Sequence, residues 1–555
     1  MFKPSERIAL AALDRPTREV EWLRLLAALH TQPGFWWLDS AMLEGRLGRL
    51  SFAGANPYLW LRARGREIEI EVERGVRPGL LPGYQRFASD PIEAARGLLP
   101  RADSLLYSTR TGTPSRRRAW REVAGLSAGL ELPFLGGAVG YFGYELAAQI
   151  EPRIRFDHPD DLELADLSLA FVDQVLAYDH GAERLWLVGL GFGDPHSALG
   201  GDARELALER SREVVDRLEG CVESLLSVPA QTSSVRGKAA KRALTRLTVA
   251  STTDPSGYAK AVDSILEEIA KGEVYQANFS QRLTIDAPGD PWILYGELRR
   301  KNPAPFGAYL ALPDDVVILS SSPERFLRVD SSRRVQSRPI KGTRPRGASE
   351  FEDARLEAEL QASEKDRAEN LMIVDLVRND LGRVCTPGSI AVPELMQIEA
   401  YAAVFQMVST VTGSLATGRD AFDLIEATFP PGSMTGAPKL ASIELLESLE
   451  TVRRGVYAGA LGYLDLRGGL DLSVVIRTLI WKDGKAHLHV GGGVVADSSP
   501  DGEYLESLDK ARAPLAALES AQALSFEQIE EREEEEREEE EIEEIEKIRE
   551  IEDSA

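Results

Sequence analysis

The sequence contains only two cysteines in 555 residues, Cys221 and Cys385. Two cysteines cannot build the disulfide framework of a small secreted protein, and their spacing fits no zinc site. We therefore expect a reducing, cytoplasmic environment. Long apolar runs are also missing. No stretch approaches the roughly 18 uncharged apolar residues of a membrane helix, and residues 1–22 lack the apolar segment of a secretion signal, so we expect no membrane partner.

Signals for nucleotide and nucleic-acid binding are equally scarce. No GxxxxGK[ST] sequence occurs, which excludes a P-loop. The formal net charge is −24, but residues 527–555 alone carry 16 Glu and one Asp against three Arg and one Lys, a net of −13. Without this tail the charge is −11, and a moderately acidic body argues against broad nucleic-acid binding. We expect the tail to be a solvated, partly helical appendage; a docking helix for a basic partner is the alternative.

The composition that remains is that of a globular protein, with 43% hydrophobic and 28% charged residues. Alternating apolar residues predict strands at 59–64 and 67–72, and residues 203–225 have the pattern of a helix. We divide the chain into a β-rich first region, a small, polar and basic linker, a motif-dense catalytic region and the acidic tail: residues 1–225, 226–250, 251–522 and 523–555.

The catalytic region begins with a helix from residue 255 to 271, because Asp254-Pro255 is an N-cap signal and Gly272 ends the pattern. Further helices are expected at 351–378, 422–429 and 437–449. Strands are expected at 456–464, 470–481 and 486–490, the last of them ending in three glycines.

A basic segment, RPIKGTRPR at residues 338–346, is the most informative stretch of the chain. Its two prolines restrict φ, and Gly342 lets the backbone approach a ligand, so the segment is expected to be a stiff turn. Lys341 lies among three arginines, and neighbouring positive charge favours the neutral, nucleophilic form of an amine. The alternative is an ordinary basic surface turn.

Two pairs of acidic residues are spaced i,i+3, which places each pair on one face of a helix: Asp366 with Glu369, and Glu503 with Glu506. Four carboxylates that converge repel one another unless a cation lies between them, and oxygen ligands favour Mg²⁺. A solvated helix face is the alternative for each pair.

Three other features suit an anionic ligand. Gly491, Gly492 and Gly493 follow a predicted strand and offer backbone N–H groups, although three glycines after a strand also make a tight turn. Arg477 is a charge in an otherwise apolar strand, either buried and paired or at an edge, and its planar fork suits a carboxylate. The loop PGSMTGAPK at residues 431–439 leads into a helix and is a candidate anion site.

Together these segments resemble the chorismate-utilising enzymes, the family of anthranilate, aminodeoxychorismate, isochorismate and salicylate synthases. The acidic pairs, the PGSMTGAPK loop, Arg477 and the triple glycine stand in the family's order between residues 254 and 516. The segments LDS at 38–40, GRLSF at 48–52 and PFLGGAVGY at 133–141 are weaker matches. The resemblance implies an α/β (α+β) fold of two large, mostly antiparallel sheets packed face to face, with flanking helices and interwoven halves.

Within that family two positions separate the chemistries. Members that add water carry a lysine base where this chain has Gln276, and glutamine cannot act as that base. Anthranilate synthases resemble PIAGT where this chain has PIKGT, the form found in aminodeoxychorismate synthases. The resemblance therefore implies transfer of an amino group to C4 of chorismate. Lys341 would attack C2 as the C4 hydroxyl leaves, and ammonia would then attack C4 as the lysine leaves C2.

The resemblance also implies roles for other residues. Glu324 matches the general acid that protonates the leaving hydroxyl. Mg²⁺ would be held by Glu369 and Glu506, with Asp366 and Glu503 behind them or through water. The substrate-binding candidates are Tyr457, Arg477, Gly491, Gly492, Gly493, Lys510 and Gln406; Gln276 and Thr343 join Lys341 and Glu324 as catalytic candidates. Gln406 stands where many relatives have a histidine, and it cannot transfer a proton in the same way.

Ammonia requires a source. Neither cysteine lies in a Gly-x-Cys-x-Gly elbow, so we expect a separate glutamine amidotransferase subunit. In relatives the first region can hold tryptophan, and Ser40, Arg49 and Ser51 match that pocket loosely, although Asp39 departs from the usual residue. Anthranilate synthase component I is the alternative enzyme, and a non-catalytic sensor of chorismate or tryptophan is the alternative of another class.

Overall fold

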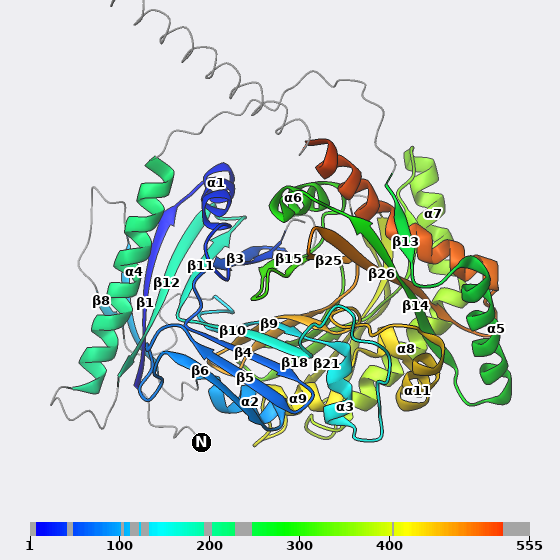
Figure 1. Cartoon of the computed structure of the whole chain (residues 1–555), viewed down its shortest axis with the longest axis horizontal. Coiled ribbons are helices and arrows are strands. Elements are labelled where there is room, and N and C mark those ends of the chain that lie inside the picture. The colour runs from blue at the N-terminus through cyan, green and yellow to red at the C-terminus, as the bar shows by residue number, and fades with distance from the viewer. Residues whose placement is uncertain are drawn as a thin grey trace, which may run out of the picture.

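The fold is built from two large β-sheets that pack against each other, with helices around them (Figure 1). This computed structural model describes residues 7–40, 48–100, 105–111, 121–123, 132–193, 202–227, 247–401 and 404–524. Within these residues one sheet has 14 strands in the order β13-β14-β26-β25-β16-β15-β2-β3-β11-β12-β1-β7-β8, with β22 beside β14. The other has 12, in the order β19-β21-β18-β17-β24-β23-β9-β10-β4-β5-β6, with β20 beside β21. Described strand pairs are antiparallel except β1 with β7, so the expected fold class is confirmed.

The bounds of the elements are as follows. The 14-stranded sheet contains β1 Arg7–Pro16, β2 Trp36–Asp39, β3 Leu50–Gly54, β7 Leu105–Thr111, β8 Arg121–Val123, β11 Gln174–Asp179, β12 Arg184–Gly193, β13 Val249–Ser251, β14 Gln276–Asp286, β15 Phe306–Ala311, β16 Val317–Ser322, β22 Gly436–Ala437, β25 Thr478–Lys482 and β26 Lys485–Val494. The 12-stranded sheet contains β4 Leu59–Arg64, β5 Glu67–Val72, β6 Gly83–Ala88, β9 Gly137–Phe142, β10 Leu167–Val172, β17 Arg325–Val329, β18 Arg334–Arg338, β19 Ile340–Pro345, β20 Ala391–Ala400, β21 Val404–Ser414, β23 Ala460–Asp465 and β24 Leu470–Val474. The helices are α1 Glu19–Leu29, α2 Pro91–Leu98, η2 Tyr144–Leu146, α3 Ala147–Ile150, α4 Ala203–Ser227, α5 Pro255–Lys271, α6 Pro291–Lys301, α7 Glu350–Ala362, α8 Glu364–Gly382, α9 Ala421–Thr428, α10 Gly432–Thr435, α11 Lys439–Leu449 and a C-terminal helix over residues 500–524.

Both sheets contain strands from both halves of the chain. In the larger sheet β2 pairs with β15, and in the smaller sheet β9 pairs with β23. Between the sheets, the ring of Phe52 on β3 lies 5.8 Å from that of Tyr463 on β23, and both are buried. Each buried side chain of this size contributes about 1.5–3 kcal/mol to folding. The two halves therefore share their sheets and their core. The predicted boundary at residues 225–251 stays a prediction.

Several local predictions are confirmed. Strands β4 and β5 match the expected ranges, and α4 covers the helix predicted at 203–225. Helix α5 begins after Asp254, whose side chain accepts a hydrogen bond from the Gly257 amide at 2.6 Å, and it ends at Gly272 with φ of +83°. Most of the predicted linker and nearly all of the acidic tail lie outside the described residues.

Other local predictions are wrong in instructive ways. The helix predicted at 351–378 is two helices, α7 and α8, because Ser363 leaves the helical conformation and its hydroxyl caps α8 by accepting from the Asp366 amide at 3.3 Å. The segment 338–346, expected to be a turn, includes the edge strand β19. This strand pairs with β21 through an irregularity at Gly342, where φ is +87°.

The apolar run at 470–481, predicted to be one strand, is divided between the two sheets. β24 belongs to the smaller sheet and β25 to the larger one, and the chain crosses between the sheets at residues 475–477. The run looks continuous because both strands are buried. Arg477 lies in the crossing with φ of +50°, not within a strand.

Three more boundaries differ from the prediction. The three glycines lie within β26, opposite Ser280, Phe279 and Asn278 of β14, so they form part of the sheet and not an exposed turn. Strand β23 begins at Ala460, and α11 begins only after Pro438.

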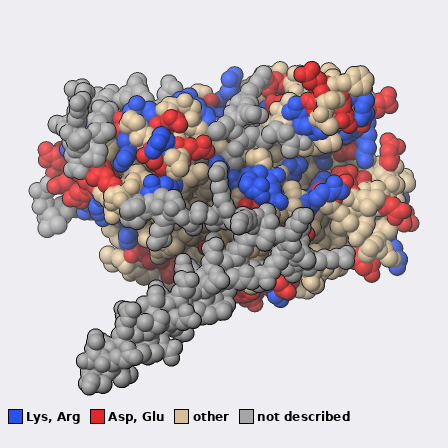
Figure 2. All heavy atoms as spheres, turned by 90° about the horizontal axis from the view of Figure 1, so that it is seen from above, with Lys and Arg blue, Asp and Glu red and all other residues tan. Residues whose placement is uncertain are grey.

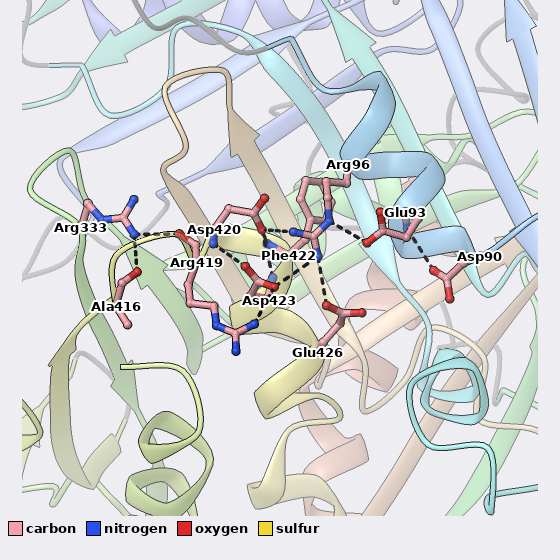
Figure 3. A network of polar contacts seen from close by, with 10 residues as sticks. All are labelled: Asp90, Glu93, Arg96, Arg333, Ala416, Arg419, Asp420, Phe422, Asp423 and Glu426. Carbon is pink, nitrogen blue, oxygen red and sulfur yellow. Dashed lines mark hydrogen bonds and ion pairs between the residues drawn. The ribbon is translucent and has the colours of Figure 1, made fainter. Parts of the chain in front are cut away.

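An ion-pair network around Arg96 connects helix α2, from the first region, to α9 (Figure 3). The Arg96 guanidinium lies 2.6 Å from Asp420 and 3.1 Å from Glu426 on the α9 side, and 2.9 Å from Glu93 on its own helix. It also lies over the Phe422 ring at 5.5 Å. Because α9 leads directly into the loop at 429–438, this network anchors one end of the loop.

The surface and the helices bear on the expected partners. Figure 2 shows acidic and basic side chains interspersed over the described part of one face, unlike the single-sign surface typical of nucleic-acid binding. Within the described residues, no helix combines the length and the apolar character needed to cross a membrane.

Candidate active site

Lys341 projects from β19 into a polar site between the two sheets. Its amine Nζ lies 3.5 Å from the carbonyl oxygen of Ser433 and 3.8 Å from a carboxylate oxygen of Glu369. The lysine side chain is 13% exposed and that of Glu369 12%, so the amine is largely shielded but accessible. A lysine amine attacks only after it has lost its proton, and the Glu369 carboxylate lies near enough to exchange that proton through a water.

Glu324 lies between β16 and β17, where the chain crosses from one sheet to the other. Burial raises the pKa of this carboxyl to about 7, against the opposing effects of the Ser433 hydroxyl, the Lys341 amine and Arg477. A carboxyl with a pKa near neutrality can donate a proton at physiological pH, which is what a general acid requires. Ser433, in α10, therefore contacts both Glu324 and Lys341.

The glycines of β26 make room for the polar groups of the site. A Cβ at Gly493 would overlap the side-chain amide of Gln276 and would lie 3.2 Å from the Lys341 amine. A Cβ at Gly492 would lie 2.6 Å from Glu503 Oε2. Gln276 is buried, and its Nε2 donates to Glu369 at 3.4 Å. Alternate faces of one strand thus leave space for the amine and for the acidic group.

We expect Gly493→Ala to lower catalytic turnover by roughly 10²-fold, because displacing Gln276 or Lys341 by about 1 Å is enough for such a loss. Overpacking of this kind typically costs about 1–3 kcal/mol in stability, so the variant should still fold. Gly296→Ala is the matched control, since its added Cβ meets no atom within 4 Å in α6. Turnover of the two variants and their thermal unfolding distinguish a blocked site from a general loss of stability.

The four carboxylates proposed for the metal come from α8 and the C-terminal helix. Lysines currently neutralise three of them: Lys341 lies 3.8 Å from Glu369, Lys365 3.6 Å from Glu503, and Lys510 2.8 Å from Glu506. Among the described residues, no three His, Cys, Asp or Glu side chains are close enough to form a ready-made metal site. Glu506 and Asp366 nevertheless lie close enough to act on Glu369 electrostatically, so the metal site stays a prediction.

The donor set nevertheless fits Mg²⁺. Glu503 is buried, and its Oε2 has no hydrogen-bond partner, although an orphaned buried carboxylate oxygen is costly. Burial raises the pKa of Glu369, and the nearby charge of Glu506 raises it further. Burial also acts on Glu506, but the lysines around it hold its pKa below the ordinary value. A divalent cation would satisfy these oxygens. Asp366 is instead held by Arg344 at 3.1 Å.

Arg477 and Tyr457 are the candidates for binding a substrate carboxylate. The Arg477 guanidinium makes no hydrogen bond or ion pair with the residues that the structure describes; burial lowers its pKa, and Glu324 opposes the shift. A sequestered, unpaired guanidinium is costly unless an anion joins it. Burial raises the pKa of Tyr457 to about 12, and its ring stacks on His489 at 5.1 Å. Both residues are therefore suited to a carboxylate ligand.

The remaining candidates lie around this centre. Gln406 on β21 is buried and pairs with Thr343 of β19, which is exposed. Lys510 donates to the Gly491 carbonyl at 2.8 Å. Two participants were not predicted individually. Ser433 lay within a loop flagged for anions, and Lys365 has no signal beyond its place beside an acidic pair.

A second cavity, of about 310 Å³, corresponds to the candidate tryptophan pocket. Ser40 and Arg49 line it, whereas Ser51 does not. The Ser51 hydroxyl is instead turned to the Ser40 amide at 3.0 Å and to His180 at 2.8 Å. Arg49 is engaged by Asp179 at 2.6 Å. Tryptophan binding stays a prediction.

Comparison with known proteins identifies the family. The model of the chorismate binding enzymes matches residues 93–516. The chain belongs to the chorismate binding enzyme family. It is 37% identical to an aminodeoxychorismate synthase of Streptomyces griseus over 520 residues, covering 93% of this chain and 65% of that protein.

Other chorismate binding enzymes are similar to a comparable degree. The chain is 37% identical to aminodeoxychorismate synthase component 1 of Bacillus subtilis, covering 83% of this chain and 93% of that one. It is 36% identical to anthranilate synthase component 1 of Mycolicibacterium smegmatis, covering 90% and 88%. The crystal structure of anthranilate synthase component I from Streptococcus pneumoniae aligns with a TM-score of 0.66 at 27% identity, covering 85% of this chain and 93% of that one. Identity alone thus does not separate the two activities.

Proposed function

We propose that this enzyme forms 4-amino-4-deoxychorismate from chorismate and ammonia. The observation that carries the proposal is the position of Lys341, whose amine lies between Glu369 and the Ser433 carbonyl while Ser433 also contacts Glu324. Ser433 thus lies between the amine that would attack, Lys341, and the carboxyl that would donate a proton, Glu324.

The reaction proceeds in two substitutions. The neutral Lys341 amine forms a bond to C2 of chorismate, both ring double bonds shift, and the C4–O bond breaks as Glu324 gives its proton to the leaving hydroxyl, which departs as water. Ammonia then forms a bond to C4, both double bonds shift back, and the C2–N bond breaks to release the neutral lysine amine. The new ammonium group at C4 returns a proton to Glu324. Nitrogen thus ends on the carbon that lost oxygen.

The other residues bind and orient the substrate. Arg477 and Tyr457 would hold one carboxylate of chorismate, together with the backbone of the glycines on β26. Mg²⁺ on Glu369, Glu503 and Glu506 would bind and neutralise the other carboxylate. Gln276 cannot deprotonate water, which disfavours hydroxylation of the ring, and its amide fixes Glu369.

The proposal includes a partner. We infer that ammonia comes from a separate glutamine amidotransferase subunit, in keeping with the "component 1" in the name of the Bacillus subtilis relative. The chain spans about 65% of the Streptomyces griseus relative, so the activity of that whole protein is not transferred to it directly. Cytoplasmic location and a role in making 4-aminobenzoate for folate belong to the same proposal.

Anthranilate synthase component I is the second candidate, because relatives of that name are nearly as similar. The deciding experiment incubates the purified chain with chorismate, Mg²⁺ and an ammonium salt and identifies the product by chromatography. We expect 4-amino-4-deoxychorismate, and we expect glutamine to replace ammonium only when an amidotransferase subunit is added. Anthranilate as the product would identify the second candidate, and undiminished chorismate would leave a binding protein.

A further inference from the structure

Arg454 is a charged side chain at the centre of the catalytic half that no step of the proposed reaction uses. It lies four residues after Glu450, the residue that follows α11, and it is 2% exposed. Its guanidinium makes a two-pronged ion pair with Glu450, from Nε at 2.8 Å and from Nη2 at 2.6 Å. The Ser280 amide at 2.9 Å and the Ser280 hydroxyl at 2.7 Å also donate to Glu450, so the carboxylate is fully engaged.

The remaining donors of Arg454 reach two backbone carbonyls. Nη1 donates to the Met434 carbonyl at 2.9 Å, and Nη2 donates to the Asn278 carbonyl at 2.6 Å. Met434 follows Ser433 in α10, and Asn278 lies two residues after Gln276 on β14. One planar group therefore connects the loop that carries Ser433 to the strand that carries Gln276.

Two further contacts extend this connection. The guanidinium lies over the rings of Tyr144 at 4.5 Å and Tyr457 at 5.9 Å. Glu145 of η2, from the first region of the chain, accepts the Arg454 amide at 2.8 Å and the Gly455 amide at 3.0 Å, which fixes the backbone that leads to Tyr457. The arginine thus contacts the loop that carries Ser433, the strand that carries Gln276 and the ring of Tyr457.

We propose that Arg454 is a positioning residue that holds Ser433 between Lys341 and Glu324 and sets the Tyr457 ring against the substrate. The inference rests on the proposed chorismate chemistry. Arginine suits this role because its rigid fork bonds a carboxylate and two carbonyls at once, whereas lysine offers one point charge.

The test uses Arg454→Lys and the double variant Arg454→Gln with Glu450→Gln, which removes both charges and leaves no buried charge unpaired. Chorismate depletion with Mg²⁺ and ammonium is measured against pH, and thermal unfolding is recorded. We expect kcat to fall roughly 10- to 100-fold in both variants. KM for chorismate should rise by a smaller factor, because Arg477 would still hold the carboxylate that Tyr457 contacts.

The pH profile separates positioning from folding. Charged groups that face Glu324 are Lys341 and Arg477, and Arg325 and Asp380 line the small cavity of about 20 Å³ beside it. The Ser433 hydroxyl holds the Glu324 pKa down. Withdrawing Ser433 should therefore move the alkaline limb of kcat to higher pH, and Ser433→Ala should reproduce this shift.

The control is another buried ion pair, Arg110 on β7 with Glu219 on α4, whose atoms lie 2.5 Å apart. Changing both to glutamine should lower the unfolding temperature and leave the alkaline limb in place. A wild-type kcat and pH profile in Arg454→Lys, or in the double variant, would overturn the proposal. A wild-type chain that consumes no chorismate would instead refute the proposed function.

Discussion

Lys341→Ala is expected to lower the rate of 4-amino-4-deoxychorismate formation by about 10³-fold or more, because the first substitution loses its nucleophile. Binding of chorismate should persist, since Arg477, Tyr457 and the acidic residues are untouched. Ammonia can still attack C2 directly in this variant. A small amount of anthranilate-like or elimination product is therefore expected. Product chromatography under matched chorismate and ammonium concentrations measures both quantities.

The matched variant is Lys341→Arg, which keeps a positive charge beside Glu369 but cannot act as a nucleophile, because guanidinium stays protonated. Loss of C4 amination in both variants would assign the effect to the amine and not to its charge. Intact-mass analysis of the wild-type chain during stalled turnover should reveal an adduct on a peptide that contains residue 341. An unaltered rate of C4 amination in either variant would remove Lys341 from the mechanism.

Glu324→Gln is expected to lower turnover by roughly 10²–10⁴-fold, the usual contribution of a general acid. The active form of Glu324 is protonated, and burial raises its pKa to about 7. Wild-type kcat should therefore be retained below about pH 7 and should fall as pH rises through that value. The glutamine variant carries no titrating group there, so its residual rate should lose this alkaline limb.

Asp380→Asn provides the comparison for Glu324, because Asp380 lines the same small cavity but is paired with Lys439, at 2.8 Å. It should retain the alkaline limb, whatever its effect on stability. An alkaline limb that survives in Glu324→Gln would show that another group supplies the proton.

Much of the candidate site was predictable because its chemistry is encoded in short segments. Lys341 stands in PIKGT, and the acids stand at i,i+3 on helices, so local sequence suffices to nominate them. The fold class followed from the same resemblance. Period-two and capping patterns located β4, β5 and α5, where local propensity and tertiary packing agree.

The rest depended on contacts between distant segments. Nothing in an apolar run shows that it changes sheets, so the crossing at Arg477 was hidden within a single predicted strand. The glycines of β26 suggested a loop by composition, whereas their function is to leave space opposite Gln276 and Glu503. The sequence around Ser51 suggested a ligand pocket, but its hydroxyl forms hydrogen bonds with the Ser40 amide and with His180.

The interlaced sheets have a consequence for how this protein can change over time. Because β2 pairs with β15 and β9 with β23, removing either half would leave unpaired edge strands within both sheets. Recombination can add modules at the ends of such a chain, but it cannot trade one half for a foreign counterpart. The cavity lined by Ser40 and the candidate active site must therefore be inherited together.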